Sequence, residues 1–188
     1  LKNNITLQTG ARYNQVIVDA KFDDRFYDFP FSEARIYTGA LTGTAGLTWQ
    51  PNAVLGWKLN FSTAFRAPNI DDVGKVFDSE PGAVVVPNPN LKPEYAYNGE
   101  VGLSLNFNEV VKLDLAGFYT QLDDALVRRN FTLNGQSMIE YQGELSQVQA
   151  IQNAASGEVY GFEAGAEVNF TKHLQLISQF NITEGTQE

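Results

Sequence analysis

Apolar and polar residues alternate along most of this chain, and the spacing typical of amphipathic helices is nearly absent. In Leu55–Phe65 the odd-numbered residues are mostly apolar or aromatic, and the even-numbered ones are small or polar. The same alternation runs through Tyr95–Phe107, Val111–Tyr119 and Tyr160–Phe170. A period of two places successive side chains on opposite faces of a β-strand. The pattern therefore predicts an all-β chain of antiparallel strands.

Three further stretches alternate more loosely and are also predicted to be strands: Ile5–Phe22, Tyr37–Trp49 and Leu174–Ile182. The first of them exchanges its apolar face near Gln15, which predicts a β-bulge at that position. A half-buried sheet in a soluble β-sandwich shows similar alternation. Strand length, loop length and the placement of aromatic residues distinguish the two architectures.

The predicted strands are long. They run for about 13 residues, whereas strands of globular proteins average five or six. At 3.4 Å per residue and a tilt of about 40°, such a strand rises roughly 30 Å, enough to cross the ~25 Å apolar band of an outer membrane. Strand length therefore favours a transmembrane β-barrel over a sandwich.

The connections between the strands are of two kinds. The tight turns are Gln50–Ala53, Asn108–Glu109 and Thr171–His173, and the long connections are Asp23–Ile36, Ala67–Pro93 and an excursion after Leu122. Short turns at one end of the strands and long loops at the other are typical of an outer-membrane barrel.

Aromatic residues gather at both ends of the predicted strands, on the apolar face. The group near the tight turns is Trp49, Trp57, Phe107 and Phe170, and the group near the long loops is Tyr37, Phe65, Tyr95, Tyr97 and Tyr119. Two such groups match the aromatic belts at the two membrane interfaces. The opposite face carries Gly, Ser, Asn, Lys and Glu, which suits a water-filled lumen.

The excursion after Leu122 contains Asn134–Gly135 between two β-prone runs. An Asn-Gly pair in this setting is the strongest short hairpin signal. We therefore predict a projecting hairpin with its tip at Asn134–Gly135, in which Phe131–Leu133 lies beside Met138–Tyr141.

Together these features predict an antiparallel meander of about seven long strands in a transmembrane β-barrel. An odd number of strands cannot close such a barrel, because the first and last strands would run parallel. The chain also ends on the polar run Asn181–Glu188, which is expected to be a loop. We therefore expect residues 1–188 to be a partial barrel, cut from a larger one. Its free edges and apolar face predict self-association, or a sheet curled inward around that face, when lipid and detergent are absent.

Composition narrows the chemistry. The net charge of −9 argues against nucleic-acid binding. The chain has no cysteine, and His173 is its only histidine, so we expect neither a metal site nor a Ser–His–Asp triad. No apolar run approaches the roughly 18 residues of a membrane helix. We expect no catalytic residues, no enzymatic activity and no resident cofactor.

One long segment interrupts the alternation and carries a family resemblance. "FRAPN" at Phe65–Asn69 ends a predicted strand, and "NPNLKPE" at Asn88–Glu94 opens the next one after a long loop. The pair is followed by "LDLAGFYTQLDDALV" (Leu113–Val127), then Asn153, then "VYGFEAGAEV" (Val159–Val168). This arrangement closely resembles the C-terminal β-barrel of TonB-dependent outer-membrane receptors, over nearly the whole chain.

The motif residues are Phe65, Arg66, Ala67, Pro68, Asn69, Asn88, Pro89, Leu91, Lys92, Pro93 and Glu94. The prolines remove backbone donors and the asparagines favour turns, so a sheet ladder cannot pass through this segment. We expect the motif to be structural: it holds the loop in shape and fixes the entry of the next strand at the outer rim.

The resemblance implies a barrel of about 22 strands, an N-terminal plug domain and a TonB box, of which the plug and the box are absent from this segment. It implies energised uptake of a scarce, bulky nutrient, above all an iron–siderophore or haem, across the outer membrane of a bacterium. The implied partners are the TonB complex, reached through the plug, outer-membrane lipid and the small-molecule nutrient. Haem ligation by a histidine of this segment is not expected, because His173 lies in a turn on the periplasmic side.

Four charged residues near the long loops are candidates for ligand contacts. Arg128 and Arg129 suit an anionic nutrient or a lipopolysaccharide phosphate. Asp71 and Asp72, like the acid pair Asp123–Asp124, suit a cation. Solvated loop charges are the simpler interpretation of all of them. Two other classes of function stay open: a structural or adhesive barrel without energised transport, and an outer-membrane hydrolase, for which no catalytic set is found in the sequence.

Overall fold

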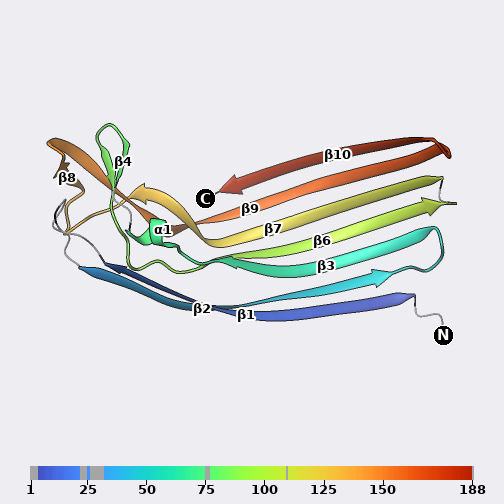
Figure 1. Cartoon of the computed structure of the whole chain (residues 1–188), viewed down its shortest axis with the longest axis horizontal. Helices are drawn as coiled ribbons and strands as arrows, with labels where there is room; N and C mark the ends of the chain where they lie inside the picture. The colour runs from blue at the N-terminus through green and yellow to red at the C-terminus, as the bar shows by residue number, and fades with distance from the viewer. Residues whose placement is uncertain (1–3, 22–24, 26–31, 75–76, 109, 188) are drawn as a thin grey trace.

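A computed structural model of the chain describes residues 4–21, 25, 32–74, 77–108 and 110–187. Its long strands form one open sheet (Figure 1). The long strands are β1 (Ile5–Lys21), β2 (Glu33–Trp49), β3 (Leu55–Arg66), β6 (Glu94–Phe107), β7 (Val111–Asn130), β9 (Glu144–Thr171) and β10 (Leu174–Gln187). The short elements are α1 (Ile70–Gly74), β4 (Phe77–Glu80), β5 (Ala83–Val85) and β8 (Met138–Tyr141). Within the described ranges, no helix is long and apolar enough to span a membrane.

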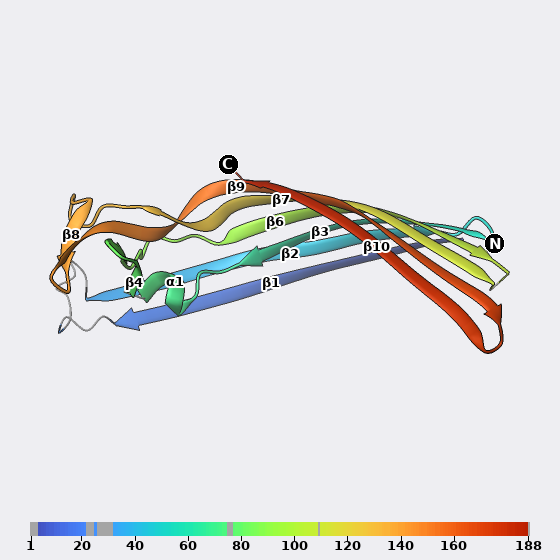
Figure 2. The same ribbon diagram turned by 90° about the horizontal axis from the view of Figure 1, so that it is seen from above.

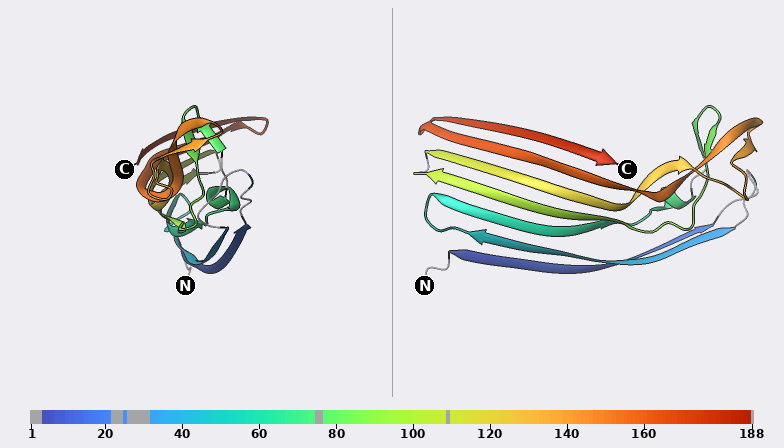
Figure 3. Two further views of the ribbon diagram at one scale, coloured as in Figure 1. Left: turned by 90° about the vertical axis from the view of Figure 1, so that its left-hand side faces the viewer. Right: turned by 180° about the vertical axis from the view of Figure 1, so that it is seen from behind.

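Neighbouring long strands follow one another along the chain and pair antiparallel, from β1 through β2, β3, β6, β7 and β9 to β10. The three predicted strand pairs, β2–β3, β6–β7 and β9–β10, are confirmed. Tight connections lie at one end of the sheet, and the long connections with the short elements lie at the other (Figure 3). The Asn52 Oδ1 atom stabilises the first tight turn by accepting the N–H groups of Val54 and Leu55 at 2.9 and 2.8 Å. The predicted loop asymmetry is therefore present.

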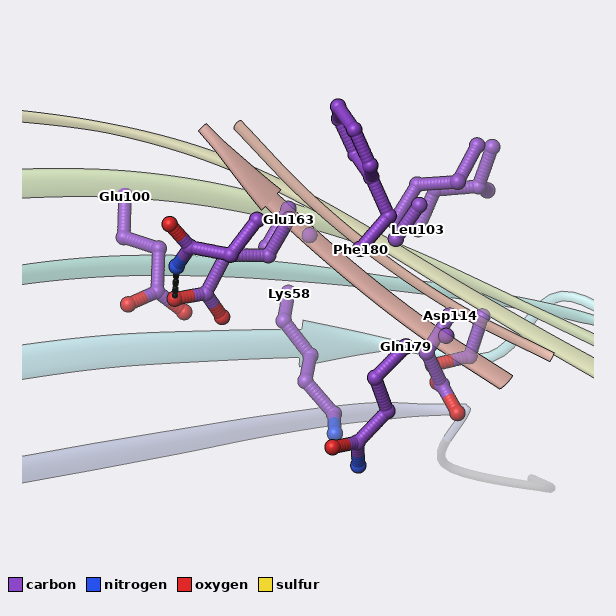
Figure 4. Close-up of a pocket in the computed structure, with 14 residues that line it drawn as sticks. Lys58, Glu100, Leu103, Asp114, Glu163, Gln179 and Phe180 are labelled. Carbon is purple, nitrogen blue, oxygen red and sulfur yellow. Dashed lines mark hydrogen bonds between the residues drawn. The ribbon is translucent and has the colours of Figure 1, made fainter. Parts of the chain in front are cut away.

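The two faces of the sheet differ as the alternation predicts. Trp57, Leu103 and Leu115 are register partners on the apolar face. Figure 4 shows Leu103 and Phe180 on one side of the sheet and Lys58, Glu100 and Glu163 on the other. The apolar side chains stay open: Leu59 is 49% exposed and Phe61 is 53% exposed.

This exposure is the sidedness of a barrel wall, with the apolar face turned toward lipid. Seen from above, the sheet is bowed, and the β9–β10 hairpin turns away at the tight-turn end (Figure 2). The inward-curled sheet expected from the sequence is not adopted. Self-association through the free edges stays a prediction.

The bulge expected near Gln15 is wrong. β1 pairs with β2 in one unbroken register from Ile5↔Trp49 to Lys21↔Glu33. The apolar residues of β1 change from one face of the sheet to the other because the face that is covered changes along the strand. Near the long loops, Val18 and Ala20 pack against Leu91 of the motif loop, so the lumen-side positions become the buried ones.

The strands extend further toward the long loops than the alternation indicated. β7 continues to Asn130, and β10 continues to Gln187, where it pairs with Gly157. The loop expected at Asn181–Glu188 is therefore a strand over most of its length. Both faces of a strand are wet beyond the membrane, so alternation no longer marks it there. β2 begins at Glu33, within the connection predicted at Asp23–Ile36, most of which lies outside the described residues.

The outer ends of β7 and β9 join β5 and β8 in a small packed unit, here called the outer module. β5 pairs with β9 in parallel, at Ala83↔Gln147 through Val85↔Gln149. Its core consists of Val84, Val86, Leu133, Ile139, Val148 and Ala150, all nearly or fully buried. This is one of the few places where the described chain has a closed core, since the barrel wall itself is a single layer.

The predicted tip at Asn134–Gly135 is confirmed. Leu133 and Gln136 exchange both backbone hydrogen bonds across it, each at 2.9 Å, and Asn134 and Gly135 have φ of 54° and 77°. The pairing beyond the tip differs from the prediction. β8 pairs with the start of β9, at Met138↔Gln147, and reaches Leu133 only through side-chain packing in the outer-module core. A second turn of the same kind, at Gln142 and Gly143, joins β8 directly to β9 and so makes β9 its partner.

Candidate functional site

The two motif segments meet at the loop-side end of the sheet. Phe65–Asn69 ends β3, Asn88–Glu94 leads into β6, and Arg66 is the register partner of Glu94. The rings of Phe65 and Tyr95 lie 6.3 Å apart. Because β3 and β6 are adjacent strands, the long loop between them returns to the point where it left the sheet.

Arg66 joins the two segments through carboxylates. Its Nη2 donates to both carboxylate oxygens of Asp72 at 3.0 Å, and its Nη1 lies 3.8 Å from the Glu94 Oε2 atom. The same Glu94 oxygen accepts the backbone N–H of Leu126 at 2.9 Å. Arg66 is 46% exposed, so solvent screens the ion pairs and they add little stability. Their main effect is to orient the loop relative to β7.

Asn69 and Asp72 cap the short helix α1. The Asn69 Oδ1 atom accepts the N–H groups of Asp71 and Asp72 at 2.8 and 3.0 Å, and Asp72 Oδ2 accepts the N–H of Asn69 at 3.0 Å. This reciprocal arrangement is a capping box, with Asp in the place of the usual Glu. The sequence analysis missed it, although Asn followed three residues later by an acid before a short helix is the signal.

Asn153 fastens the second motif segment to β9. Its Oδ1 accepts the N–H of Lys92 at 2.8 Å, and its Nδ2 donates to the carbonyl oxygens of Lys92 at 2.9 Å and of Asp124 at 2.8 Å. Asp124 has a φ of 55° and lies where the β7–β9 register shifts, between Leu122 and Ala125. One side chain therefore bridges the motif loop and a β-bulge.

Asn88 and Leu91 complete the attachment. The buried Asn88 donates from Nδ2 to the carbonyl oxygen of Ile151 at 2.8 Å and accepts the N–H of Asn90 on its Oδ1 at 3.1 Å. Leu91 is buried with Ile36 and Ala20. We call the set Arg66, Asn69, Asp72, Asn88, Leu91, Glu94 and Asn153 the rim network. These contacts support the structural role expected for the motif.

The candidate ligand residues differ in their surroundings. Asp72 is engaged by Arg66 and Asn69, and its side chain is only 12% exposed, while Asp71 is exposed in the first turn of α1. Arg128 and Arg129 are exposed near the outer end of β7, opposite Ile151 and Ala150. As successive strand residues, they point to opposite faces. Contact of these residues with a ligand stays a prediction.

His173 and the acid pair Asp123–Asp124 lie in different parts of the sheet. Among the residues that the structure describes, no three His, Cys, Asp or Glu side chains gather in a way that could hold a metal ion. His173 lies in the exposed turn between β9 and β10, where its N–H donates to Thr171 Oγ1 at 3.2 Å. Asp123 accepts a hydrogen bond from Gln121 at 3.0 Å.

The polar face contains a hollow in the wall of the lumen. Lys58, Gly102, Ala116, Glu163 and Asn181 form one row across five strands. Because Gly102 and Ala116 are small, a hollow of about 580 Å³ opens between Lys58 and Glu163 (Figure 4). Asn181 Nδ2 donates to Glu163 Oε1 at 3.0 Å. The hollow offers charged and amide groups to whatever occupies the lumen.

Comparison with known proteins decides the family. The family profile described as "TonB dependent receptor-like, beta-barrel" matches residues 1–187. The chain belongs to the TonB-dependent receptor family. This confirms the resemblance carried by the paired motifs at Phe65–Asn69 and Asn88–Glu94, and it confirms the fold as a segment of such a receptor's β-barrel.

Two curated relatives show how much of a receptor this segment represents. Heme/hemopexin utilization protein C of Haemophilus influenzae is 26% identical over 177 residues, covering 85% of this chain and 24% of that protein. Hemoglobin-haptoglobin utilization protein B of Neisseria meningitidis is 32% identical over 124 residues, covering 63% of this chain and 15% of that protein. The chain therefore spans a quarter or less of the length of these relatives.

Solved structures share the fold. The FrpB iron transporter of Neisseria meningitidis superposes with a TM-score of 0.66 at 21% identity, covering 97% of this chain and 24% of that chain. A double mutant of the Serratia marcescens hemophore receptor HasR, in complex with its hemophore HasA and heme, superposes with a TM-score of 0.67 at 16% identity, covering 95% and 31%. TonB-dependent receptors are bacterial outer-membrane proteins, so this barrel segment lies in the outer membrane.

Proposed function

We propose that this chain is part of a transporter that carries an iron-bearing nutrient, haem or an iron–siderophore, across the outer membrane with energy passed through TonB. The observation that carries the proposal is membership of the TonB-dependent receptor family, whose curated relatives are named for haem and haemoglobin utilisation. The rim network agrees with this role, because a selective receptor needs outward loops that keep their shape. In this role the protein binds and moves cargo and catalyses no reaction.

The remaining parts of the transporter follow from this role. Residues 1–188 form one stretch of a larger barrel, and the plug domain and TonB box belong to the rest of the protein. The plug packs against the polar wall at Lys58 and Glu163, and the TonB complex acts through the plug. When the segment is isolated, the open edges of β1 and β10 pair with those of a second copy.

Cargo contacts in this segment come from outward-facing groups. Arg128 and Arg129 lie near the outer end of β7 and suit the carboxylate groups of haem or of an anionic siderophore. His173 lies in the β9–β10 turn, at the opposite end of the sheet from the long loops. A haem ligand would therefore come from another part of the receptor.

Growth of a deletion strain tests the proposal. The complete gene that carries this segment is deleted, and the strain is grown under iron chelation with haem, haemoglobin or a ferric siderophore as the sole iron source. Loss of growth on one of these sources, restored by the wild-type gene, is the expected result. The Arg128→Gln, Arg129→Gln variant should then slow growth on that source and leave growth on excess iron salt unchanged. Equal growth of deletion and wild-type strains on every source would overturn the proposal and favour a structural or adhesive barrel.

A further inference from the structure

Two glycines open a gap in the lipid-facing band. Gly99 of β6 is the register partner of Tyr119, and Gly117 of β7 is the register partner of Val101. The two glycines are therefore diagonal neighbours on adjacent strands, about 7–8 Å apart. The side chains around them are large and apolar, so the gap has defined walls.

Neither glycine is required by the backbone or by close packing. A Cβ atom at Gly99 would meet no atom within 4 Å, and one at Gly117 would meet only the carbonyl oxygen of Gly161, at 3.9 Å. Neither residue has a positive φ. Gly161 is different: its Cβ would lie 2.7 Å from the Phe118 ring, so packing explains that glycine. The fold would therefore accept larger side chains at Gly99 and Gly117, and the open space above them needs another explanation.

The gap is the floor of an apolar hollow of about 650 Å³. Its walls include Leu59, Phe61, Val101 and Tyr119, which stand between 43% and 53% exposed on the lipid-facing side. These residues belong to the band that the membrane covers. The occupant is therefore apolar and comes from the membrane, because water in such a site would gain no hydrogen-bond partners.

The height of the hollow indicates the kind of occupant. Tyr119 and Tyr160 are register partners in one row of the aromatic group near the long loops, and the Tyr160 hydroxyl reaches Glu184 Oε2 at 3.1 Å. Tyrosine hydroxyls and carboxylates mark the headgroup level of the outer leaflet. Gly117, Val101 and Leu59 lie on the membrane side of that row. A lipid whose headgroup sits at the row would extend its chain into the hollow.

We propose that the hollow at Gly99 and Gly117 is a binding site for one acyl chain of an outer-leaflet lipid. The glycines let the chain lie against the backbone, and Phe61 and Tyr119 flank it. A retained chain of this kind seals the surface of the wall over adjacent strands β3, β6 and β7. The continuity of the site with the lipid-facing band argues for lipid rather than for a membrane protein.

Filling the hollow tests the proposal in the complete receptor. The Gly99→Leu, Gly117→Leu variant adds two side chains whose Cβ atoms meet no obstruction. Its matched control, Ala11→Leu, Ala166→Leu, adds the same bulk to the same face outside the hollow. Each protein is purified in mild detergent, and retained lipid is counted by native mass spectrometry, before and after addition of a dipalmitoyl phospholipid. The filled variant should bind the lipid about tenfold more weakly. The leucines exclude part of the acyl chain, and losing the burial of two of its methylene groups changes a binding constant by about that factor. The control should match the wild type.

A second measurement needs no filled variant and works even if that variant folds poorly. A photocrosslinking residue replaces Leu59 in the otherwise wild-type receptor, and crosslinking is done in living cells. An adduct with the mass of a lipid is the expected result. An adduct with a protein would overturn the proposal, and so would equal lipid retention by the filled and control variants.

Discussion

Asn153 gives Lys92 both of the hydrogen bonds that a neighbouring strand would give it. The Asn153 Oδ1 atom accepts the Lys92 N–H at 2.8 Å and its Nδ2 donates to the Lys92 carbonyl at 2.9 Å, although the two residues are 61 positions apart. A third bond, from Nδ2 to the Asp124 carbonyl at 2.8 Å, ties in the bulge of β7. The motif loop is thus attached where a regular ladder is interrupted.

We predict that Asn153→Ala loosens this attachment. The substitution removes three hydrogen bonds, each contributing about 1 kcal/mol, so local opening becomes easier by about 2–3 kcal/mol. Amide exchange at Lys92 in the detergent-solubilised receptor should accelerate by roughly 30- to 150-fold.

The matched control is Asn181→Ala, which removes two exposed hydrogen bonds on the polar wall, one to Glu163 and one from Thr183. It should leave exchange at Lys92 unchanged. Asn153→Asp should behave like the alanine variant, because a carboxylate cannot donate to the carbonyl groups of Lys92 and Asp124. Normal protection of Lys92 in Asn153→Ala would show that the side chain does not fasten the loop.

Much of the barrel wall could be predicted from the sequence because lipid and lumen impose opposite demands on its two faces. Over Leu55–Phe65 and Tyr95–Phe107 every second residue meets lipid, so the alternation marks the strands, and tight turns set the pairing of β3 with β2 and of β6 with β7. The prediction fails beyond the membrane. There Val18 and Ala20 face a packed loop, and the end of β10 beyond Glu184 has water on both sides, so the same backbone carries another pattern.

The rim network could be predicted only in part. The motif resemblance brought Arg66, Glu94 and Asn153 to attention, and a structural role was expected for the motif residues. Their contacts could not be derived, because Asn153 bonds Lys92 at the point where a bulge at Asp124 interrupts the β7–β9 register, and the sequence pattern does not record that bulge. The parallel pairing of β5 with β9 is similarly non-local: it depends on how the outer module packs, which no local pattern records.

The cap of α1 leads to a second prediction. Asn69→Ala removes the acceptor for the N–H groups of Asp71 and Asp72 and should cost about 1 kcal/mol locally. Asn69→Ser keeps a side-chain acceptor and should cost less. Amide exchange at Asp71 and Asp72 measures the difference. Equal exchange in the alanine and serine variants would rule out a capping role.

Gly161 leads to a third prediction. A Cβ atom there would lie 2.5 Å from the Ile182 carbonyl oxygen and 2.7 Å from the Phe118 ring, so Gly161→Ala forces β9 and β10 apart. We expect a loss of about 1–3 kcal/mol in stability, as for other overpacked positions. The readout is the temperature at which the receptor loses its compact migration in SDS gels. Gly99→Ala, whose Cβ meets nothing within 4 Å, is the control and should melt like the wild type.

The outer module leads to the last prediction, that its stability is separable from that of the barrel wall. Ile139 is only 5% exposed and packs in a core with Val148 and Leu133. Ile139→Ala should cost about 2–5 kcal/mol at that site, since it leaves a cavity among apolar side chains. The core residues of the outer module lie outside the part of the sheet where β9 pairs with β10. The melting temperature of the barrel should therefore stay constant, while proteolysis within residues 131–147 accelerates. Leu145→Ala, at a side chain that is 64% exposed, should change neither measurement. If Ile139→Ala instead lowered the melting temperature of the whole barrel, the outer module would be an integral part of the wall's folding unit.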